Sequence, residues 1–536
     1  MGNASDVPGD AVTTSWFLSA SERGNPATLL NRRHDGAAWT TGNDLTLLHG
    51  RDYFRSLCRE LDSVSRGDVV LFTDWRGDPD ERLAGTGTAV VDILRSVAHR
   101  GVRVKGLLWR SHPDRTRFSE EENRDLAAEV TDAGGEVLLD ERVRRAGSHH
   151  QKLFVVLHHD DPVRNVAFIG GIDLCHGRND DDSHRGDSQW TKMDPRYGRT
   201  PAWHDLQAEI HGPAVAEIAE TFRERWNDQT PLRTRKLPIG KRSAERREER
   251  LEPMVKSTIV APPAGSQFVQ VLRTYPAKRP KYPFAPHGER SIARAYLKAF
   301  QRARRLVYIE DQYLWSMSAA VALGDALRRH PQLRLAVVVP RYPDEDGRFS
   351  GPPNRIGQIN VIRHLNEVAG PRLAVYDLET ERFPIYVHAK VCIIDDVWMT
   401  IGSDNLNRRS WTHDSELSCA VLDEHRDPRE PADPAALGDG ARVLARSTRM
   451  SLWSEHLETT DIPVDPDDGF DLLRASANRL DQWHASGRRG PRPPGRLRNH
   501  IPDQVPRSLR PLSACLYHLV NDPDGRPMSL RLRRSF

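Results

Sequence analysis

The sequence predicts an α/β protein with two similar domains, each a mostly parallel β-sheet flanked by helices, and a functional site at their interface. Three observations lead to this prediction. Short apolar runs typical of buried strands alternate with segments of helical periodicity. A cluster of polar residues precedes one such run at His150, and a similar cluster recurs at His388. The two histidines are 238 positions apart, which suits a domain-sized unit used twice.

The first domain is predicted over residues 46–231. A polar extension, residues 1–45, precedes it and is either a tail or a cover over this domain. Strands that alternate with helices are typical of a parallel sheet covered on both faces. The expected elements are helices at 51–65, 90–99 and 215–226, and strands at 68–74, 102–109, 136–139, 153–156 and 166–170.

A charged linker is predicted at residues 232–262, as an exposed helix or, in a sharper interpretation, a nucleic-acid patch. The second domain follows over residues 263–460. Residues 461–536 form a basic, proline-rich extension that either contacts anionic lipid head groups or is a solvated segment. The elements expected in the second domain are strands at 268–272, 306–309, 333–339, 391–394 and 398–401, a helix at 292–300, and a candidate lid at 341–358.

Charge and composition narrow the class of protein. With 78 basic and 75 acidic side chains the formal net charge is +3, which disfavours a dedicated nucleic-acid binder. Five cysteines without a CxxC pair indicate unpaired thiols in a reducing compartment. The N-terminus lacks the features of a classical signal peptide, and no apolar stretch approaches the roughly 18 to 20 residues of a membrane span. We therefore expect a cytoplasmic protein. Peripheral contact with a membrane is compatible with this expectation.

The cluster at His388 combines the groups that a phosphodiester site needs. His388 and Lys390 are two positions apart, so on a strand they point to the same face and can hold one anion together. The buried run 391–394 separates them from Asp395, and a glycine turn returns the chain so that Asn405 approaches the same place. A neutral imidazole is a nucleophile, an ammonium neutralises phosphate charge, and an amide donates to a phosphoryl oxygen.

The cluster at His150 repeats this pattern. His150 and Lys152 precede the apolar run 153–156, and the next run ends in a glycine pair at 170–171 before Asp173. Burying two lysines and two histidines without a function would be costly. The recurrence therefore argues against incidental polar residues in core strands.

The two clusters resemble the paired HxKxxxxD motifs of the phospholipase D superfamily. The segment Gly170-Gly-Ile-Asp-Leu-Cys-His-Gly-Arg178 is similar to the branch that contains the eukaryotic-type phospholipases D. The matching segments run in the family's order from about Asp68 to about Leu457. Further matches are Pro201-Ala-Trp-His-Asp205, Gly212-Pro-Ala, Tyr308-Ile-Glu-Asp-Gln-Tyr313 and Asp414-Ser-Glu-Leu417.

The resemblance implies roles for individual residues. His150 would attack phosphorus and His388 would protonate the leaving alcohol, although the symmetry of the motifs leaves the reverse assignment open. It implies no metal and no cofactor, so the other nearby histidines are interpreted as surface or supporting residues. The supporting set comprises Lys152, Lys390 and Asn405 for the non-bridging oxygens, Asp205 and Glu416 to orient the histidines, and Asp173 and Asp395 close to them.

Two positions depart from the family's pattern. Leu157 stands where the first motif has its aspartate, and we expect Asp160 to take over that supporting role after a small shift of the loop. Asp173 stands where many members carry asparagine. Because an ionised carboxylate that faces phosphate is unfavourable, we expect Asp173 to orient Lys152 or the histidine instead.

The resemblance implies phospholipase D activity, which converts a glycerophospholipid to phosphatidic acid and its head-group alcohol or transfers the phosphatidyl group to another alcohol. A nucleic-acid phosphodiesterase, a cardiolipin-synthase-like transferase and a non-catalytic membrane scaffold remain as alternatives. The expected partner is phospholipid at a membrane surface, with no stable nucleic-acid partner. Because one chain carries both motifs, we expect a monomer. The sequence leaves the head group open.

Overall fold

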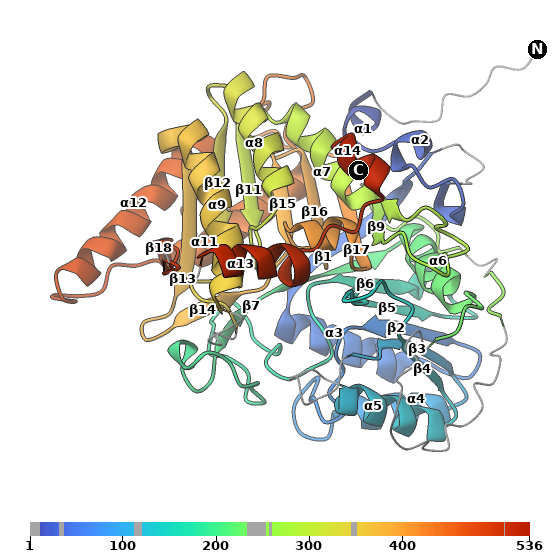
Figure 1. Ribbon diagram of the computed structural model, residues 1–536. Helices are drawn as coiled ribbons and strands as arrows, with labels where there is room; N and C mark the ends of the chain where they lie inside the picture. Colours follow the sequence, from blue (N-terminus) through green and yellow to red (C-terminus); the bar gives the residue numbers. More distant parts are fainter. Residues whose placement is uncertain are drawn as a thin grey trace, which may run out of the picture.

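The computed structural model describes residues 11–31, 37–111, 120–232, 253–256, 260–344, 351–506, 508 and 510–536. The strands form two sheets, each covered by helices, which lie side by side in the molecule (Figure 1). The α/β class predicted from the sequence is thereby confirmed. Most of the linker predicted at 232–262 lies outside the described residues.

The first sheet has the strand order β4-β3-β2-β5-β6-β8-β1. Only the β2–β3 and β3–β4 pairs are parallel, and the other four pairs are antiparallel. The strands span Thr40–His49 (β1), Val69–Asp74 (β2), Arg103–Trp109 (β3), Glu136–Asp140 (β4), Leu153–Leu157 (β5), Val166–Gly170 (β6) and Leu206–His211 (β8).

The second sheet follows the same plan. Its parallel strands β11, β12 and β13 continue on one side into the antiparallel series β15, β16, β17 and β9. The strands span Gln267–Tyr275 (β9), Glu289–Arg290 (β10), Leu306–Glu310 (β11), Arg334–Val338 (β12), Leu373–Glu379 (β13), Pro384–Val387 (β14), Val391–Ile394 (β15), Trp398–Gly402 (β16), Glu416–Asp423 (β17) and Leu497–Asn499 (β18).

Both sheets are mixed, which corrects the expectation of mostly parallel sheets. The strands that follow the two polar clusters, β5 and β15, each pair antiparallel with the next strand in the sequence. Short loops join these strands, and a short connection permits only an antiparallel pair. The parallel pairs that the alternation of helices and strands predicts are therefore confined to β2, β3 and β4 in the first repeat and to β11, β12 and β13 in the second.

Two strands tie the sheets together. β1 pairs with β8 of the first sheet and also with β9 of the second. β7 (Ala202–His204) pairs in parallel with β14 of the second sheet. The domain boundary predicted at residue 45 falls inside β1. A strand that pairs with both sheets does not show the pattern of apolar residues that would assign it to one of them. The two sheets therefore form one continuous framework around the seam between them.

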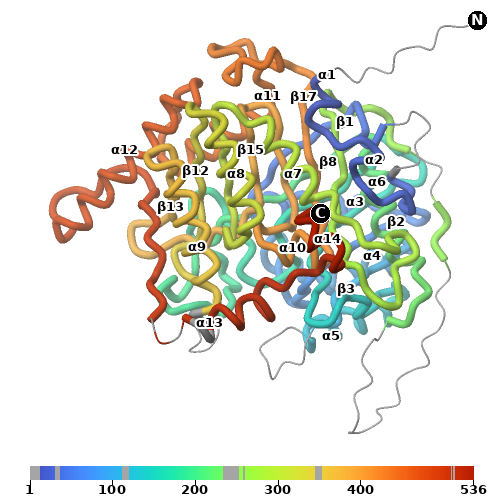
Figure 2. Tube along the Cα trace, turned by 45° about the horizontal axis from the view of Figure 1, so that its top comes forward, coloured from blue at the N-terminus to red at the C-terminus, as the bar shows by residue number. Residues whose placement is uncertain are grey.

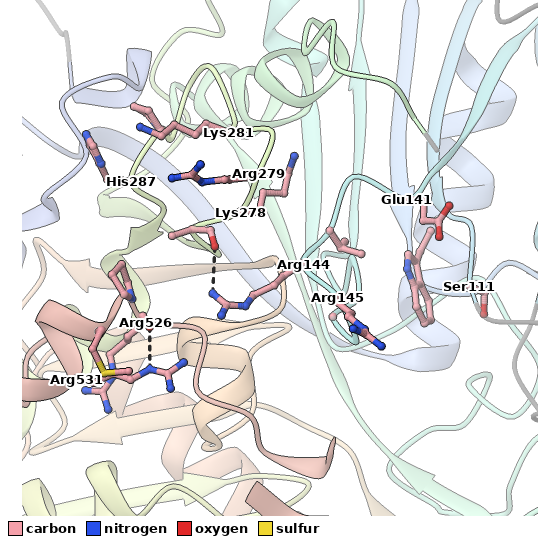
Figure 3. Close-up of a pocket in the computed structure, with 17 residues that line it drawn as sticks. Ser111, Glu141, Arg144, Arg145, Lys278, Arg279, Lys281, His287, Arg526 and Arg531 are labelled. Carbon is pink, nitrogen blue, oxygen red and sulfur yellow. Dashed lines mark hydrogen bonds between the residues drawn. The ribbon is translucent and has the colours of Figure 1, made fainter. Parts of the chain in front are cut away.

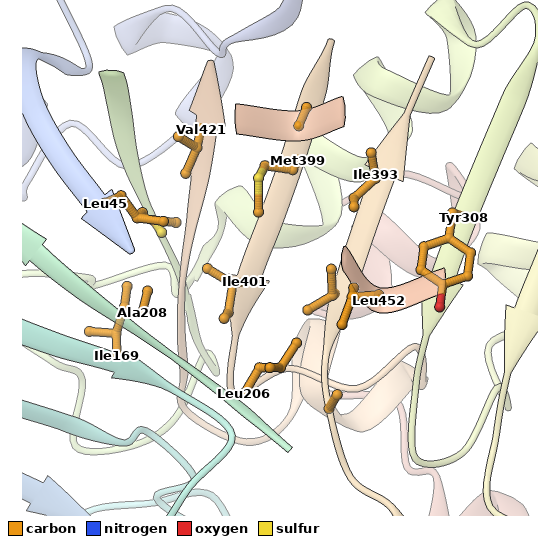
Figure 4. Close-up of a cluster of buried hydrophobic side chains, with 14 of the residues drawn as sticks. Leu45, Ile169, Leu206, Ala208, Tyr308, Ile393, Met399, Ile401, Val421 and Leu452 are labelled. Carbon is orange, nitrogen blue, oxygen red and sulfur yellow. The ribbon is translucent and has the colours of Figure 1, made fainter. Parts of the chain in front are cut away.

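Helices complete the layers. The outer face of the first sheet packs against one group of helices and the outer face of the second sheet against another, and each interface has its own apolar cluster. A third cluster fills the space between the sheets, where Leu45, Ile169 and Ala208 of the first sheet share one apolar cluster with Met399 and Ile401 of the second (Figure 4). The first group comprises α3 (Gly50–Ser63), α4 (Val90–His99) and α5 (Glu120–Asp132), the second α7 (Ser291–Arg302), α8 (Met317–Arg329) and α9 (Gly351–Ala369), and the central cluster includes α6 (Ala214–Trp226), α11 (Val443–Leu457) and α12 (Pro466–Ala485).

The N-terminal segment covers the second sheet rather than the first. Within it, α1 (Ala11–Trp16) and α2 (Ala20–Arg23) lie against α7 (Figure 2). The Trp16 ring stacks on Trp398 at 6.4 Å between centroids. This apolar contact could not be assigned from the sequence, because the partner lies almost 400 positions away.

The C-terminal extension is packed against the molecule and is not a solvated segment. β18 adds to the edge of β13, and the chain continues through α13 (Arg510–Leu516), a π-helical turn Tyr517–Asn521 and α14 (Met528–Leu532). The backbone carbonyl of Phe536 accepts hydrogen bonds from Arg294 in α7. Within the segment, Arg498 forms ion pairs with Glu379 and Asp481, which composition alone does not reveal.

Candidate active site

The two polar clusters occupy matching positions in the two sheets. His150 and Lys152 immediately precede β5, and His388 and Lys390 immediately precede β15. In both copies the lysine ammonium donates to the backbone carbonyl of the histidine two positions earlier. This local contact follows from the spacing and holds each histidine and lysine on one side of the chain.

Each histidine receives a carboxylate from the other half of the molecule. Nδ1 of His150 lies 2.9 Å from Oε2 of Glu416, and Nδ1 of His388 lies 2.6 Å from Oδ2 of Asp205. The backbone repeats the exchange, since the His150 amide donates to the Ser415 carbonyl at 2.9 Å. The His388 amide likewise donates to the carbonyl of His204 at 2.8 Å. The two half-sites therefore complete one another across the seam.

Asp173 and Asn405 differ in their surroundings. Asp173 Oδ2 lies 3.5 Å from the Lys152 ammonium, and its Oδ1 accepts from the amides of Trp75 and Arg76. The structure thus places Asp173 beside Lys152. Asn405 is buried, and its Oδ1 has no hydrogen-bond partner among the described residues.

Burial and the lysines shift the pKa values of the two histidines in one direction. Burial, and then Lys152, hold the pKa of His150 well below its usual range. Burial, and then Lys390, do the same for the pKa of His388. Burial also lowers the pKa of Lys390 to about 8, with Lys152 adding to the effect and Asp205 opposing it. The charge of a lysine in one half-site therefore affects the pKa of a group in the other.

The two carboxylates differ in proton affinity. Burial alone would raise the pKa of Asp205, but contact with His388 and the charge of Lys390 hold it well below the usual value. Burial and Asp414 raise the pKa of Glu416 to about 8. The Glu416–His150 pair therefore holds one proton more than the Asp205–His388 pair near neutral pH, and this proton belongs to the pair.

Asp395 does not reach the two histidines. Its carboxylate accepts hydrogen bonds from the backbone amides of residues 304, 305 and 306 at 2.8 Å each, at the far end of β15. It ties β15 to the start of β11 and has no contact with the histidines. Its inclusion among the site residues is therefore corrected: in a strand, a residue five positions beyond the lysine lies too far along the chain to share its contacts.

In the first sheet a carboxylate also joins the two corresponding strands, β2 and β5, but it belongs to β2 rather than to β5. Asp68, at the start of β2, accepts from the amides of Ser65 and His159. This contact explains why Leu157 is tolerated at the aspartate position. The expected substitute, Asp160, has a side chain 95% exposed. It therefore does not replace the missing aspartate, and that expectation was wrong.

Gly171 leaves room for the Asp205 carboxylate. A Cβ at Gly171 would come within 2.2 Å of Asp205 Oδ1. At the matching position the second sheet has Ser403, whose hydroxyl donates to Glu416 at 2.6 Å. The glycine thus allows one carboxylate to pack against the backbone, and the serine holds the other through a hydrogen bond.

Gly171→Ala is expected to displace Asp205 and lower kcat by about 100-fold, since a misplacement of about 1 Å can cost that much in catalysis. The measurement is steady-state turnover beside a thermal melt. Ser403→Ala is the matched variant, because it removes only one hydrogen bond to Glu416 and should cost about tenfold or less. Equal turnover in Gly171→Ala and the wild type would contradict this account.

Sequence reasoning missed a buried group of imidazoles and carboxylates beside Asp205. His204 is fully buried and lies between Glu310 and Glu455. Glu310 belongs to the motif Tyr308-Ile-Glu-Asp-Gln-Tyr313, which could have signalled it, whereas Glu455 sits on a helix whose apolar stripe gives no such sign. Ligand-type atoms lie within 4.8 Å of one another in two sets, His49 with His204 and Glu455, and His204 with Glu310 and His456. These sets are the residues in the described part of the chain that could hold a metal ion.

A basic cavity of about 1100 Å³ lies next to the site (Figure 3). Its wall residue Trp109 stacks on Trp75 at 5.6 Å, and Trp75 meets the His150 ring edge-on at 6.3 Å. Arg144 donates to the carbonyls of Ala277 and Gly525. Glu141 is the one carboxylate among the lining residues, against the seven cations Arg144, Arg145, Lys278, Arg279, Lys281, Arg526 and Arg531.

Comparison with known proteins places the whole arrangement in a family. The family model described as phospholipase D matches residues 79–323 and 362–476, which include both clusters and both orienting carboxylates. The chain belongs to the phospholipase D family. Among the helices that the structure describes, none combines the length and apolar character needed to cross a membrane.

Curated relatives are plant phospholipases D. Phospholipase D beta 2 of Arabidopsis thaliana is 25% identical over 78% of this chain and 58% of its own length. Phospholipase D gamma 3 of the same plant is 26% identical over 79% of this chain and 64% of its own. The chain thus spans about three fifths of these relatives. A solved structure, phosphatidylserine synthase of Haemophilus influenzae Rd KW20, matches 71% of this chain and 82% of its own with 15% identity and a TM-score of 0.49.

Proposed function

We propose that this protein is a phospholipase D that cleaves the head group of a glycerophospholipid and releases phosphatidic acid, or transfers the phosphatidyl group to an alcohol. The observation that carries the proposal is the exchange of carboxylates between the half-sites, which gives each histidine a partner on Nδ1 and leaves Nε2 for a phosphate. The plant phospholipases D among its relatives support a lipid substrate.

In the proposed reaction the two histidines act in line on phosphorus. Nε2 of His150 attacks and forms a phosphohistidine, while His388 gives a proton to the leaving alcohol. Lys152, Lys390 and the Asn405 amide hold the non-bridging oxygens as their charge develops. In the second step His388 takes a proton from water or an acceptor alcohol, whose oxygen forms a bond to phosphorus as the bond between phosphorus and Nε2 of His150 breaks.

The extra proton on the Glu416–His150 pair matters for this assignment. If His150 attacks, this proton must pass to the His388 side when substrate binds. The reverse assignment, with His388 as the nucleophile, needs no such transfer. Mass mapping of the phosphorylated peptide after a rapid quench in alkaline denaturant, in which phosphohistidine survives, distinguishes them, and we propose His150 because the resemblance assigns the first-motif histidine.

The test of the proposed function is incubation with mixed phospholipid vesicles and a primary alcohol, read by mass spectrometry. Phosphatidyl-alcohol formed by the wild type and absent with His150→Ala is the expected result. A protein that leaves every lipid intact but cleaves a labelled oligonucleotide would instead be a nucleic-acid phosphodiesterase. Condensation of two phosphatidylglycerol molecules into cardiolipin would mark the transferase alternative.

The activity should fall above about pH 8. There Lys390 loses the proton that binds phosphate, and the Glu416–His150 pair loses the proton that the site needs for its acid, each with a pKa of about 8. We therefore expect kcat/KM to decline more steeply than loss of one proton allows. In Lys390→Arg the decline of kcat/KM at alkaline pH should correspond to the loss of one proton only, because arginine stays charged. A flat profile to pH 10, about two units above both values, would contradict this.

The basic cavity suggests contact with anionic lipid at a membrane surface. Charge reversal of two exposed cations at its rim, Arg279→Glu with Lys281→Glu, is expected to weaken binding to vesicles that contain phosphatidylserine by about tenfold or more, since each surface cation contributes about 1 kcal/mol. Sedimentation with vesicles measures this. Arg363→Glu, at an exposed position of α9 outside the cavity, is the matched control. Unchanged sedimentation of the double variant would assign the cavity no role at lipid surfaces.

A further inference from the structure

His204 is held between two carboxylates from the other half of the molecule. Its Nε2 lies 2.7 Å from Oε2 of Glu310, and its Nδ1 lies 2.9 Å from Oε1 of Glu455. All three side chains are buried or nearly so. Two facing carboxylates favour the ring with both nitrogens protonated: burial opposes the charge of His204, but Glu310 and Glu455 hold its pKa well above the usual value.

The contacts continue outward, across the seam at Glu455 and within the second half at Glu310. Glu455 also meets Nε2 of His184 at 2.8 Å and Nε2 of His49 at 3.3 Å. Glu310 also meets Nε2 of His456 at 2.8 Å and accepts from the Tyr308 hydroxyl at 2.5 Å. Three imidazoles from the β1 to β7 segment therefore interlock with two carboxylates carried by β11 and α11.

The distances between these imidazole nitrogens and carboxylate oxygens distinguish a hydrogen bond from a shared metal ion. A metal ion bound at about 2.0 to 2.2 Å from each ligand holds neighbouring ligand atoms more than 3 Å apart. The separations at Glu310 and between His184 and Glu455 are 2.7 to 2.8 Å, which is the length of a charge-assisted hydrogen bond, and Nδ1 of His204 forms an ion pair with Oε1 of Glu455 at 2.9 Å. Protons, rather than an ion, therefore join these groups.

The interlock acts on the site through the backbone of one residue. The His204 carbonyl accepts hydrogen bonds from the amides of His388 and Ala389 at 2.8 and 3.1 Å. The next residue in the chain is Asp205, whose carboxylate meets the His388 ring. Fixing the His204 side chain thus fixes both the backbone that carries His388 and the carboxylate that orients its ring.

Among the residues that the structure describes, the other half-site has no equivalent. Ser415 takes the place of His204, because its carbonyl accepts from the His150 amide and the next residue is Glu416. Its hydroxyl lies 2.6 Å from His149 Nδ1, a single contact without a carboxylate on both sides. The interlock is therefore a feature of the His388 half alone.

We infer that His204 is a positioning residue for His388, which holds the Asp205–His388 pair in place because Glu310 and Glu455 clamp its ring across the seam. This inference rests on the proposed function for its kinetic test. His204 itself does not contact substrate in this role. Glu310 and Glu455 together form the clamp that holds its ring.

The kinetic test compares His204→Gln with His388→Ala on two substrates, a phosphatidyl alcohol with an alkyl head group and phosphatidyl-p-nitrophenol, whose leaving group needs little protonation. We expect His204→Gln to lower kcat by about 100-fold with little change in KM. Its loss should have the same dependence on leaving group as that of His388→Ala. The double variant should be no slower than His388→Ala alone, because a residue that acts through His388 has no effect once His388 is absent.

The matched control is His500→Gln. His500 is buried and lies 3.0 Å from Asp377, so this variant removes a buried histidine and carboxylate contact away from the two motifs. Equal losses on both substrates, or additive losses in the double variant, would overturn the inference and leave His204 a general stabiliser. If His204→Gln does not fold, Glu310→Gln replaces it, since the amide keeps the shape and removes the charge.

A measurement without substrate separates this inference from the proposed function. Nitrogen-15 spectra of histidine-labelled wild type should show one imidazole with both nitrogens protonated at about pH 8.5, where an ordinary histidine is neutral, and His204→Gln should remove it. That signal in a protein inactive on lipids would refute the function and keep the clamp. Its absence, or stoichiometric metal lost in His204→Gln, would overturn the clamp.

Discussion

Alanine at His150 or at His388 should lower kcat by about 10⁴-fold or more, the largest effect expected of any single change in this chain. A carboxylate of the other half-site fixes each ring through Nδ1. Neither histidine can therefore move to the opposite side of the phosphorus and take over the role of the other. The two losses should also be far from additive, because both groups act in one step.

The two variants should differ in one observable. The variant that lacks the nucleophile forms no phosphohistidine with any substrate, whereas the variant that lacks the acid still forms it from phosphatidyl-p-nitrophenol. Rapid quench followed by peptide mapping reads this directly. Phosphohistidine in both variants would contradict the single shared site, and its formation in His150→Ala alone would reverse the proposed roles.

The orienting carboxylates should have the next largest effects, and they should be unequal. Asp205→Asn is expected to lower kcat by about 10³ to 10⁴-fold, because the amide donates to Nδ1 and fixes the wrong tautomer of His388. Glu416→Gln should cost more, because burial and Asp414 raise the pKa of Glu416 to about 8 and the amide that replaces it cannot release the proton that the site needs for its acid. Turnover at about pH 7 in both variants measures the difference.

Asp395→Asn is the control for these two changes. Its carboxylate ties three backbone amides at the end of β15, so the variant should lose about 1 to 3 kcal/mol of folding stability and keep kcat within a few-fold. A chemical denaturation curve beside the kinetics tests this. A collapse of kcat in the folded Asp395→Asn protein would return Asp395 to the site, and equal losses in Asp205→Asn and Glu416→Gln would refute the difference in proton affinity.

The sequence alone determined the fold class, the repeat and the two histidine and lysine pairs. These features are local: a spacing of two on a strand, an apolar run after it and a glycine turn are all contained in a few tens of residues. The resemblance added Asp205 and Glu416, which composition and periodicity could not have paired with the opposite histidines.

Only the tertiary structure decided which contacts cross the seam. The antiparallel half of each sheet, the transfer of the strand tie from Leu157 to Asp68, and the removal of Asp395 from the site all depend on strand register. The clamp around His204 depends on α11, whose residues lie about 250 positions away in the sequence. A hydrogen bond is specified by position and direction in space, and a sequence pattern carries this information only for neighbours along the chain.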